Sequence, residues 1–310
     1  MRNYITIDTG TTNTRIHLVQ GGSITRKLHF PVGARNGITD KTLLPQTLRK
    51  GIEQLLQETG LAEKDICRVL ASGMITSEFG LVNLPHVVAP AGVKVLHANM
   101  FETVLPEITR IPFVFIRGVK TDCHDLAHAD MMRGEETEIM GLGCDGAGIY
   151  ILPGSHSKLI RTDAEGAITD FQTMLTGEMI AAISGNTILN GVVQLGDWPI
   201  DPAYLEQGYT YAEERGINEA LFKVRILKNI FGKSEGQIYN FFMGVILCDE
   251  IRSILAATPE KITIAGKKAI KESMAILLRS RTAAPVEVVA EERADTASVF
   301  GAIRIFEYLS

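Results

Sequence analysis

The feature that most constrains the fold is a short internal repeat. The segment Ile149–Ile160 aligns with Ile5–Ile16 without a gap, at a constant offset of 144 residues. Each segment has an apolar strand, a glycine turn with hydroxyl side chains, and a second strand, so that Gly10 falls on Gly154. Shared turn chemistry is the alternative explanation, because Gly and Ser are common in turns. A duplication would predict two related domains in a chain of 310 residues.

Hydrophobic periodicity predicts the other elements. Strands are expected at residues 4–8, 16–19, 66–71, 111–116, 167–171, 261–265 and 286–290. Helices are expected at residues 42–58, 137–142, 177–189 and 294–309, with several more after Trp198. No low-complexity segment or long linker interrupts the chain, so the two domains are expected to be compactly joined.

The charge balance and the cysteines bound the class of protein. Acidic residues outnumber basic ones 36 to 31, which argues against bulk binding to nucleic acid or to an anionic membrane. No signal peptide is visible, and the most apolar window, 238–247, is too short to span a membrane. The four cysteines form no CxxC pair, so they are expected to be reduced thiols of a cytoplasmic protein. The oligomeric state stays open, a homo-oligomer included.

The repeated turns have the chemistry of phosphate-binding loops. The backbone N–H groups of a glycine turn and the neighbouring hydroxyls form a concave set of donors for phosphate oxygens. Asp8 stands beside the first turn, and Mg²⁺ takes one or two carboxylates besides phosphate and water. Leu152 occupies the matching position, so one carboxylate for one metal ion is expected. The alternative is that Asp8 and the threonines merely cap a tight turn. The predicted phosphate ligands are Gly10, Thr11, Thr12 and Asn13 in the first turn and Gly154, Ser155, His156, Ser157 and Lys158 in the second.

Further motifs make a family resemblance specific. "IDTGTTNTR" and "LPGSHSK" resemble the two phosphate loops of sugar kinases in the actin–hexokinase superfamily. "MRGEETEIMG" (Met132–Gly141) and "FQTMLTGEM" (Phe171–Met179), together with "PGSHSK", resemble the 2-dehydro-3-deoxygalactonokinase family. The similarity runs from Tyr4 to the final helix, which is nearly the whole chain.

The resemblance implies an α/β fold with two duplicated βββαβα domains, of the ribonuclease H-like or actin/hexokinase type, around a central cleft. Residues 1–141 would form the first domain, residues 142–293 the second, and the C-terminal helix 294–310 would return to complete the first. The implied reaction is the ATP-dependent phosphorylation of 2-dehydro-3-deoxy-D-galactonate at its terminal hydroxyl, with Mg²⁺ as cofactor and ATP docked on the second domain. The product would be the 6-phosphate.

The resemblance also implies a catalytic carboxylate just ahead of the second phosphate loop. Glu135 and Glu136 are the candidates, and since neighbours on a helix point about 100° apart, they cannot face the acceptor hydroxyl equally. Glu135 is favoured because it directly follows Gly134, as the catalytic Asp of related sugar kinases follows a Gly. Glu136 would then orient Arg133 or cap the helix. Arg133 suits the carboxylate of a sugar acid or the transferred phosphate, and a helix-surface pair with Glu136 is its alternative.

Two polar loops are assigned to the sugar side. Thr176 and Glu178 begin a predicted helix, where N–H groups and a hydroxyl can hold an anion, although Thr176 could be a simple N-cap. Met74, Ser77 and Glu78 leave a strand in a polar loop that the resemblance places near the sugar. A plain strand-to-helix connection is the alternative for that loop.

Gly266 stands where the superfamily carries a Gly-rich adenosine loop. Lys267 and Lys268 follow it in place of small residues, so the nucleotide preference stays open. Asp8 is thus assigned to the metal and Gly266 to the nucleotide.

Other classes of function remain as alternatives. A metal-dependent hydrolase would use the potential ligands gathered within nine residues, namely Asp122, Cys123, His124, Asp125, His128 and Asp130. An actin-like ATP-binding assembly protein would leave the Glu135–Glu136 pair and the TGE motif without a task. A kinase for a related sugar or sugar acid is the nearest alternative, because one sequence does not fix the stereochemistry at each hydroxyl.

Overall fold

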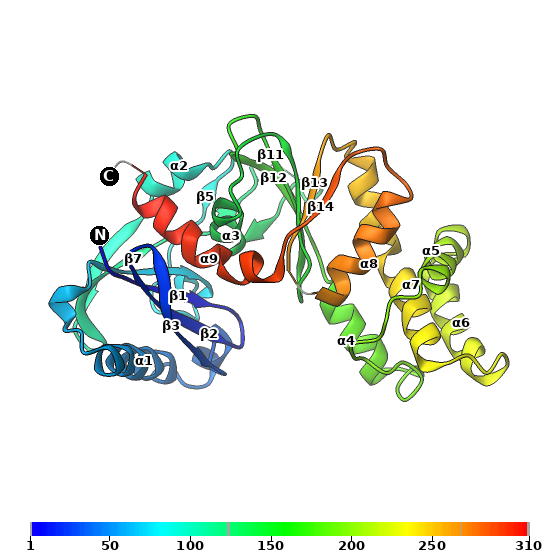
Figure 1. Ribbon diagram of the computed structural model, residues 1–310, viewed down its shortest axis with the longest axis horizontal. Coiled ribbons are helices and arrows are strands. Elements are labelled where there is room, and N and C mark those ends of the chain that lie inside the picture. The colour runs from blue at the N-terminus through cyan, green and yellow to red at the C-terminus, as the bar shows by residue number, and fades with distance from the viewer. Residues whose placement is uncertain (1, 123–124, 267, 309–310) are drawn as a thin grey trace. The chain divides into compact units, whose positions relative to one another are not determined.

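The computed structural model describes residues 2–122, 125–266 and 268–308 and divides into two compact units (Figure 1). Unit 1 comprises Met1–Gly146, Asp163–Asp170 and Glu292–Ser310. Unit 2 comprises Ala147–Thr162 and Phe171–Glu291. Each unit contains a mixed β-sheet with helices packed on it.

The sheet of unit 1 has the strand order β3-β2-β1-β4-β7-β6. β1, β2 and β3 form an antiparallel meander, β4 and β7 run parallel to β1, and β6 closes the edge in the antiparallel direction. The turn between β2 and β3 uses Gly21 and Gly22 with φ of 60° and 82°, as the sequence predicts for a tight hairpin. The strands are β1 (Tyr4–Thr9), β2 (Thr14–Gln20), β3 (Ser23–Phe30), β4 (Arg68–Gly73), β6 (Phe101–Leu105) and β7 (Thr109–Phe115).

The core of unit 1 lies between this sheet and the predicted amphipathic helix. α1 (Leu43–Thr59) buries Leu48 and Ile52 in one hydrophobic cluster with Ile5 and Ile7 of β1. Because these positions recur at helical spacing on α1 and at alternate positions on β1, each element turns one face to the core. α1 ends at Gly60 in the left-handed conformation, with φ of 68°.

The sheet of unit 2 repeats the arrangement of unit 1. Its order β12-β11-β10-β13-β14 matches β3-β2-β1-β4-β7, and β10 pairs antiparallel with β11 and parallel with β13, as β1 does with β2 and β4. The duplication expected from the 144-residue repeat is therefore confirmed at the level of topology. The strands are β10 (Gly148–Leu152), β11 (Ser157–Thr162), β12 (Ile168–Met174), β13 (Ile262–Ile264) and β14 (Val286–Val288).

Helices between β12 and β13 build most of the core of unit 2. α7 starts at a capping box formed by Ser234 and Gln237 and is buried almost continuously from Ile238 to Cys248. Although α7 is apolar, no helix in the described ranges is long and apolar enough to cross a membrane. The helices are α4 (Thr176–Asn186), α5 (Pro202–Arg215), α6 (Ile217–Asn229), α7 (Glu235–Ala256) and, after β13, α8 (Lys268–Arg279).

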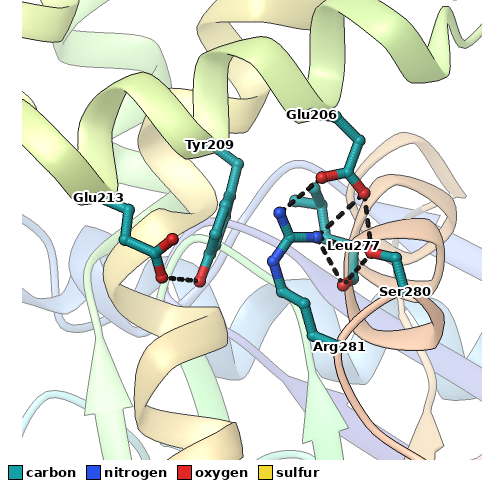
Figure 2. A network of polar contacts seen from close by, with 6 residues as sticks. All are labelled: Glu206, Tyr209, Glu213, Leu277, Ser280 and Arg281. Carbon is teal, nitrogen blue, oxygen red and sulfur yellow. Dashed lines mark hydrogen bonds and ion pairs between the residues drawn. The ribbon is translucent and has the colours of Figure 1, made fainter.

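An ion pair and a cation–π contact of Arg281 connect α5 to the segment after α8. Figure 2 shows the guanidinium of Arg281 pointing at Glu206, to which it donates hydrogen bonds of 2.9 and 2.5 Å. The same guanidinium lies 3.7 Å from the ring centroid of Tyr209, whose hydroxyl donates to Glu213 at 2.9 Å. Since all these groups are satisfied by one another, the network is structural.

The last helix, α9 (Glu291–Phe306), packs on α3 (Glu135–Gly141) of unit 1. A Cβ atom at Gly301 would collide with the Thr137 carbonyl, and one at Gly141 would collide with the Ala297 carbonyl. Glycine at both positions therefore allows the two backbones to touch.

The division into units differs in detail from the boundaries expected from the sequence. Residues 142–146 and 163–170 group with unit 1, whereas the sequence placed all of 142–293 in the second domain. The physical reason is local: Ile168 forms an antiparallel bridge with Ala91, and Gly166 packs against the Cys144 carbonyl. The described cysteines, Cys67, Cys144 and Cys248, are free thiols.

The short elements of unit 1 were not predicted, because two to six residues are too few to show a clear periodicity. Three two-residue strands form a small separate sheet in the order β5-β8-β9. The short elements are β5 (Val87–Val88), β8 (Val119–Lys120), β9 (Met131–Met132), α2 (Val93–Ala98) and the 3₁₀ helices η1 (Ala34–Ile38), η2 (Glu63–Asp65) and η3 (Met74–Thr76).

Candidate active site

Three parallel strands of unit 1 end at the same edge of its sheet. Thr9 of β1 lies opposite Gly73 of β4, and Ala71 lies opposite Phe115 of β7. Asp8 near the end of β1, the 73–78 loop after β4 and Arg117 after β7 therefore lie at neighbouring strand ends. In α/β sheets the carboxyl ends of the strands are where ligands bind.

The first predicted phosphate loop is a tight, exposed turn. The Gly10 N–H donates to the Asn13 carbonyl at 2.8 Å, and the Asn13 side chain donates to the Thr12 hydroxyl at 2.9 Å. Gly10, Thr11, Thr12 and Asn13 are all exposed. Within the described part of the chain, no backbone acceptor takes the N–H groups of Thr11 and Thr12. These donors can therefore serve an anion.

Gly33 supports this loop and was missed in the sequence. A Cβ atom there would lie 2.5 Å from the Thr12 nitrogen, so only glycine lets the chain pass so close. The next two residues, Ala34 and Arg35, donate their N–H groups to the carbonyls of Gly10 and Thr11 at 3.1 and 2.9 Å. The carbonyl oxygens of the loop are thus satisfied by protein, which leaves its N–H face outward.

Two glycines bring the start of α3 to Asp8. Gly73 has a φ of 84°, and a Cβ atom there would lie 2.5 Å from the Thr9 carbonyl oxygen and 3.2 Å from Oδ1 of Asp8. Gly134, with a φ of 110°, packs on Gly73, because its Cβ position is 3.3 Å from the Gly73 Cα. Since Glu135 directly follows Gly134, its backbone begins α3 beside the Asp8 end of β1.

Carboxylates gather where α3 begins beside the end of β1. Oδ2 of Asp8 is 2.6 Å from Nη2 of Arg15, and this ion pair raises the pKa of Arg15. Glu138, which the sequence analysis did not single out, is partly buried on α3, and burial followed by the charges of Asp8 and Glu135 raises its pKa to about 8. Oxygen ligands of this kind suit Mg²⁺. No three His, Cys, Asp or Glu side chains converge as a metal cluster among the residues described, but an ion that also binds phosphate and water needs fewer.

The two adjacent glutamates occupy different environments. Glu136 is fully buried and accepts the Gly134 N–H with both oxygens at 3.0 and 2.8 Å, and the Thr137 hydroxyl donates to it at 3.1 Å. Burial, and then the charge of Glu135, raises the pKa of Glu136 to about 8. This burial and the contact with Gly134 agree with the alternative of a helix cap for Glu136, and the catalytic role stays a prediction. Glu135 is only partly buried.

Arg133 supports the neighbouring loop instead of pairing with Glu136. Its guanidinium donates to the Thr76 hydroxyl at 2.8 Å and to the Leu84 carbonyl at 2.9 Å, and it forms no ion pair with a described residue. Desolvation lowers the pKa of Arg133. In the loop itself, the buried Ser77 donates to the Met74 carbonyl at 2.7 Å, whereas Glu78 is exposed.

Arg117 is a second cation near this loop that sequence reasoning missed. It follows β7, and the next residue, Gly118, packs directly against the Arg133 stem and the His86 ring. In the described ranges the Arg117 guanidinium has neither a hydrogen bond nor an ion pair, and its Nε is buried. Its place after a buried apolar strand was the only signal available in the sequence.

The second predicted phosphate loop, in unit 2, divides into an outer and an inner part. Ser155 and His156 are exposed, whereas Ser157 and Lys158 are buried. The Ser157 hydroxyl donates to Glu250, and Nζ of Lys158 donates to the Thr173 hydroxyl at 2.6 Å. Both side chains are thus engaged inside unit 2, and the phosphate role expected for them stays a prediction.

The TGE motif packs on this loop. A Cβ atom at Gly177 would collide with the Gly154 carbonyl, the Glu178 N–H donates to the Ser155 carbonyl at 3.2 Å, and the Glu178 carboxylate is 3.0 Å from Nε2 of His156. Thr176 is buried and donates to Glu250 at 2.5 Å. The sequence assigned Thr176 and Glu178 to the sugar, but the structure places both at the second loop.

Gly266 extends the internal repeat beyond the hairpins. It has a φ of 100°, and a Cβ atom there would lie 2.7 Å from the Pro153 carbonyl oxygen. Gly73 meets the carbonyl of Thr9 in the same way, and Pro153 is the repeat equivalent of Thr9. The predicted adenosine-side glycine thus adjoins the second loop. Lys267 lies outside the described residues, and Lys268 begins α8.

The alternative metal site receives no support. Cys123 and His124 lie outside the described residues. Nδ1 of His128 is 2.9 Å from Oδ1 of Asp125, and both side chains are exposed. No metal-binding group of three suitable side chains occurs in the ranges 2–122, 125–266 and 268–308.

Two related α/β units, each with a glycine turn after its first strand, define the two-domain actin/hexokinase-like class. A Sinorhizobium meliloti protein assigned as a 2-dehydro-3-deoxygalactonokinase has this fold, with a TM-score of 0.80 at 22% identity, covering 97% of this chain and 98% of its own. The activator of 2-hydroxyisocaproyl-CoA dehydratase from Clostridium difficile, solved with bound ADPNP, shares the fold at a TM-score of 0.53 and 14% identity, over 99% of this chain and 95% of its own.

The chain belongs to the 2-keto-3-deoxy-galactonokinase family, whose profile matches residues 8–303. The 2-dehydro-3-deoxygalactonokinase of Escherichia coli K12 is 26% identical over 81% of this chain and 80% of its own length. A Rhizobium meliloti relative with the name DgoK1 is 30% identical over 61% of this chain and 62% of its own. The protein is therefore a phosphotransferase of the sugar-kinase type, as the sequence motifs predicted.

Proposed function

We propose that the protein transfers the γ-phosphoryl group of ATP to the terminal hydroxyl of 2-dehydro-3-deoxy-D-galactonate, giving the 6-phosphate and ADP. The observation that carries the proposal is the contact of Gly134 with Gly73, which brings Glu135 to the strand edge that holds Asp8. Phosphoryl transfer to a hydroxyl requires a base for the hydroxyl proton and positive charge at the phosphate oxygens. Glu135 can serve as the base, and Asp8 can bind the metal ion that supplies the charge.

ATP binds unit 2 in this proposal. The turn at Gly154, Ser155 and His156, whose last two residues are exposed, offers donors to phosphate oxygens. Gly266 packs against Pro153, directly before this turn, where the nucleoside would follow. The ADPNP bound to the Clostridium difficile protein of the same fold supports a nucleotide as the ligand.

The acceptor binds unit 1. Glu135 takes the proton of the terminal hydroxyl while that oxygen forms a bond to the γ-phosphorus, and the bond between this phosphorus and the bridging oxygen of ADP breaks. Asp8 would hold Mg²⁺, which supplies positive charge to the phosphate oxygens when bound. Arg15 orients the Asp8 carboxylate through the 2.6 Å ion pair.

Arg117 is the group we assign to the carboxylate of the sugar acid. Its guanidinium has no partner within the described chain, and a bidentate Arg–carboxylate pair is strong and geometrically selective. Arg133, which is engaged with Thr76 and Leu84, instead holds the loop at 74–84 in place. Because the Arg117 guanidinium can bind a carboxylate, the site favours an acidic acceptor over a neutral sugar.

The proposal is tested by measuring ADP release with a coupled assay over a panel of acceptors. The highest kcat/KM is expected for 2-dehydro-3-deoxy-D-galactonate, with its C4 epimer lower and with D-galactose and glycerol near background. Equal rates with neutral sugars would reject the acidic acceptor but keep the kinase. ADP release that is independent of any acceptor would instead favour an ATP-hydrolysing assembly protein.

A further inference from the structure

A buried carboxylate in unit 2 connects the two segments of the second loop. Glu250 of α7 is only 2% exposed, and each of its oxygens accepts a hydroxyl. The Ser157 hydroxyl donates to Oε1, and the Thr176 hydroxyl donates to Oε2 at 2.5 Å. No cation pairs with Glu250 in the described part of the chain.

This carboxylate is poorly explained by stability alone. Its neighbours on α7 include the buried Ile246, Leu247, Ile251 and Ile254. Burying a carboxylate without a cation is unfavourable, and burial raises the pKa of Glu250, although the two hydroxyls oppose that shift. An apolar side chain of similar size would fill this place at lower free-energy cost.

The two hydroxyls belong to two segments of the second loop whose relative position matters for binding an anion. Ser157 begins β11 directly after the exposed turn, and Thr176 begins α4. Between them, Gly177 packs on Gly154, and the Glu178 N–H binds the Ser155 carbonyl. The carboxylate therefore fixes both segments to one point on α7, and with them the direction of the exposed N–H groups of the turn.

We infer that Glu250 is a positioning residue for the phosphates of the nucleotide: through Ser157 and Thr176 it holds the turn at 154–156 and the start of α4 in the arrangement that binds a polyphosphate. The inference rests on the proposed function, because it assumes that this turn binds ATP. It predicts that loss of the carboxylate weakens nucleotide binding and leaves binding of the sugar acid to unit 1 unchanged.

The test compares Glu250→Leu and Glu250→Gln with wild type. ATP and ADP affinities are measured by calorimetry, the KM values for ATP and sugar acid by the coupled assay, and the Tm by thermal denaturation. Glu250→Leu should raise the ATP dissociation constant and KM about tenfold or more, since two hydrogen bonds to a charged group are lost, while the KM of the sugar acid stays the same. Glu250→Gln keeps the size and can still hydrogen-bond both hydroxyls, so it should recover most of the affinity.

The matched control is Asn240→Leu, which removes another buried polar side chain of the same helix. Asn240 donates to the carbonyls of Pro199 and Gly236 at 3.0 and 2.8 Å, about 15 Å along the helix from Glu250. Asn240→Leu should alter the Tm but not the affinity for ATP. An unchanged ATP affinity in Glu250→Leu, or equal losses in Glu250→Leu and Asn240→Leu, would overturn the inference.

Thr176→Val gives the answer if Glu250→Leu does not fold. It removes one of the two anchoring hydroxyls with little change of shape, and it should weaken ATP binding severalfold without changing the KM of the sugar acid. Wild-type affinity in Thr176→Val would then refute the role of Glu250. If the wild-type protein binds no nucleotide, the proposed function is refuted. If the wild-type protein binds ATP and the Glu250 variant binds it equally well, only the inference about Glu250 is refuted.

Discussion

The different environments of Glu135 and Glu136 lead to opposite signatures when each is replaced by Gln. Glu135→Gln removes the proposed base, so kcat should fall about 10²–10⁴-fold, while the Tm changes little because this side chain is only partly buried. Glu136→Gln should retain a large part of kcat, because its fully buried carboxyl cannot reach an acceptor and Gln can still accept the Gly134 N–H.

Glu136→Gln should instead change how stability depends on pH. The pKa of Glu136 is about 8 in the folded protein, whereas the ordinary pKa of a glutamate is 4.5. Between these values the unfolded state loses its proton while the folded state retains it, so this group makes the protein less stable as pH rises. With these two pKa values, the free energy of unfolding falls by about 3 kcal/mol from pH 5 to pH 8 because of Glu136. Since Gln does not ionise, the Glu136→Gln variant does not lose this stability as pH rises.

The assay is chemical denaturation followed by circular dichroism at pH 5, 6, 7 and 8, together with the coupled kinase assay. Relative to wild type, Glu136→Gln should gain stability steadily as pH rises. Glu135→Gln should gain less, because it removes only the contribution of the Glu135 charge to the raised pKa of Glu136, and burial is the larger cause. If the stability difference between wild type and Glu136→Gln is independent of pH, the burial argument is refuted. If Glu136→Gln abolishes kcat while Glu135→Gln leaves it unchanged, the assignment of the base is reversed.

Three other substitutions test the remaining parts of the site. Asp8→Asn should lower kcat by orders of magnitude without unfolding the protein, and a near-normal rate would exclude the metal role. Gly73→Ala should destabilise the protein by about 2–4 kcal/mol, because it combines a φ of 84° with a Cβ atom 2.5 Å from the Thr9 carbonyl; an unchanged Tm would show that the strand end relaxes freely. Arg117→Met should raise the KM of the sugar acid at least tenfold and leave the KM of ATP unchanged. Arg49→Met, at an exposed side chain of α1, serves as the control and should change neither.

The sequence by itself determined the features that depend on neighbouring residues. Glycine turns, apolar alternation and helical spacing are local properties, so they predicted the repeated hairpins, α1 and most of the main strands. The motifs around Glu135 and the TGE segment were enough to identify the family. Two-residue strands such as β5 escaped prediction, because they exist only through their partners.

The tertiary structure alone decided which of these residues meet. Glu135 and Glu136 are neighbours in the sequence, and only the packing of α3 buries Glu136 completely. Thr176 was expected near the sugar, but its hydroxyl binds Glu250, which lies 74 positions later in the chain. Gly33 gave no signal at all, since its importance comes from the backbone of Thr12 against which it packs. Such contacts join residues far apart in the sequence, and side-chain burial and backbone approach arise only when the elements pack together.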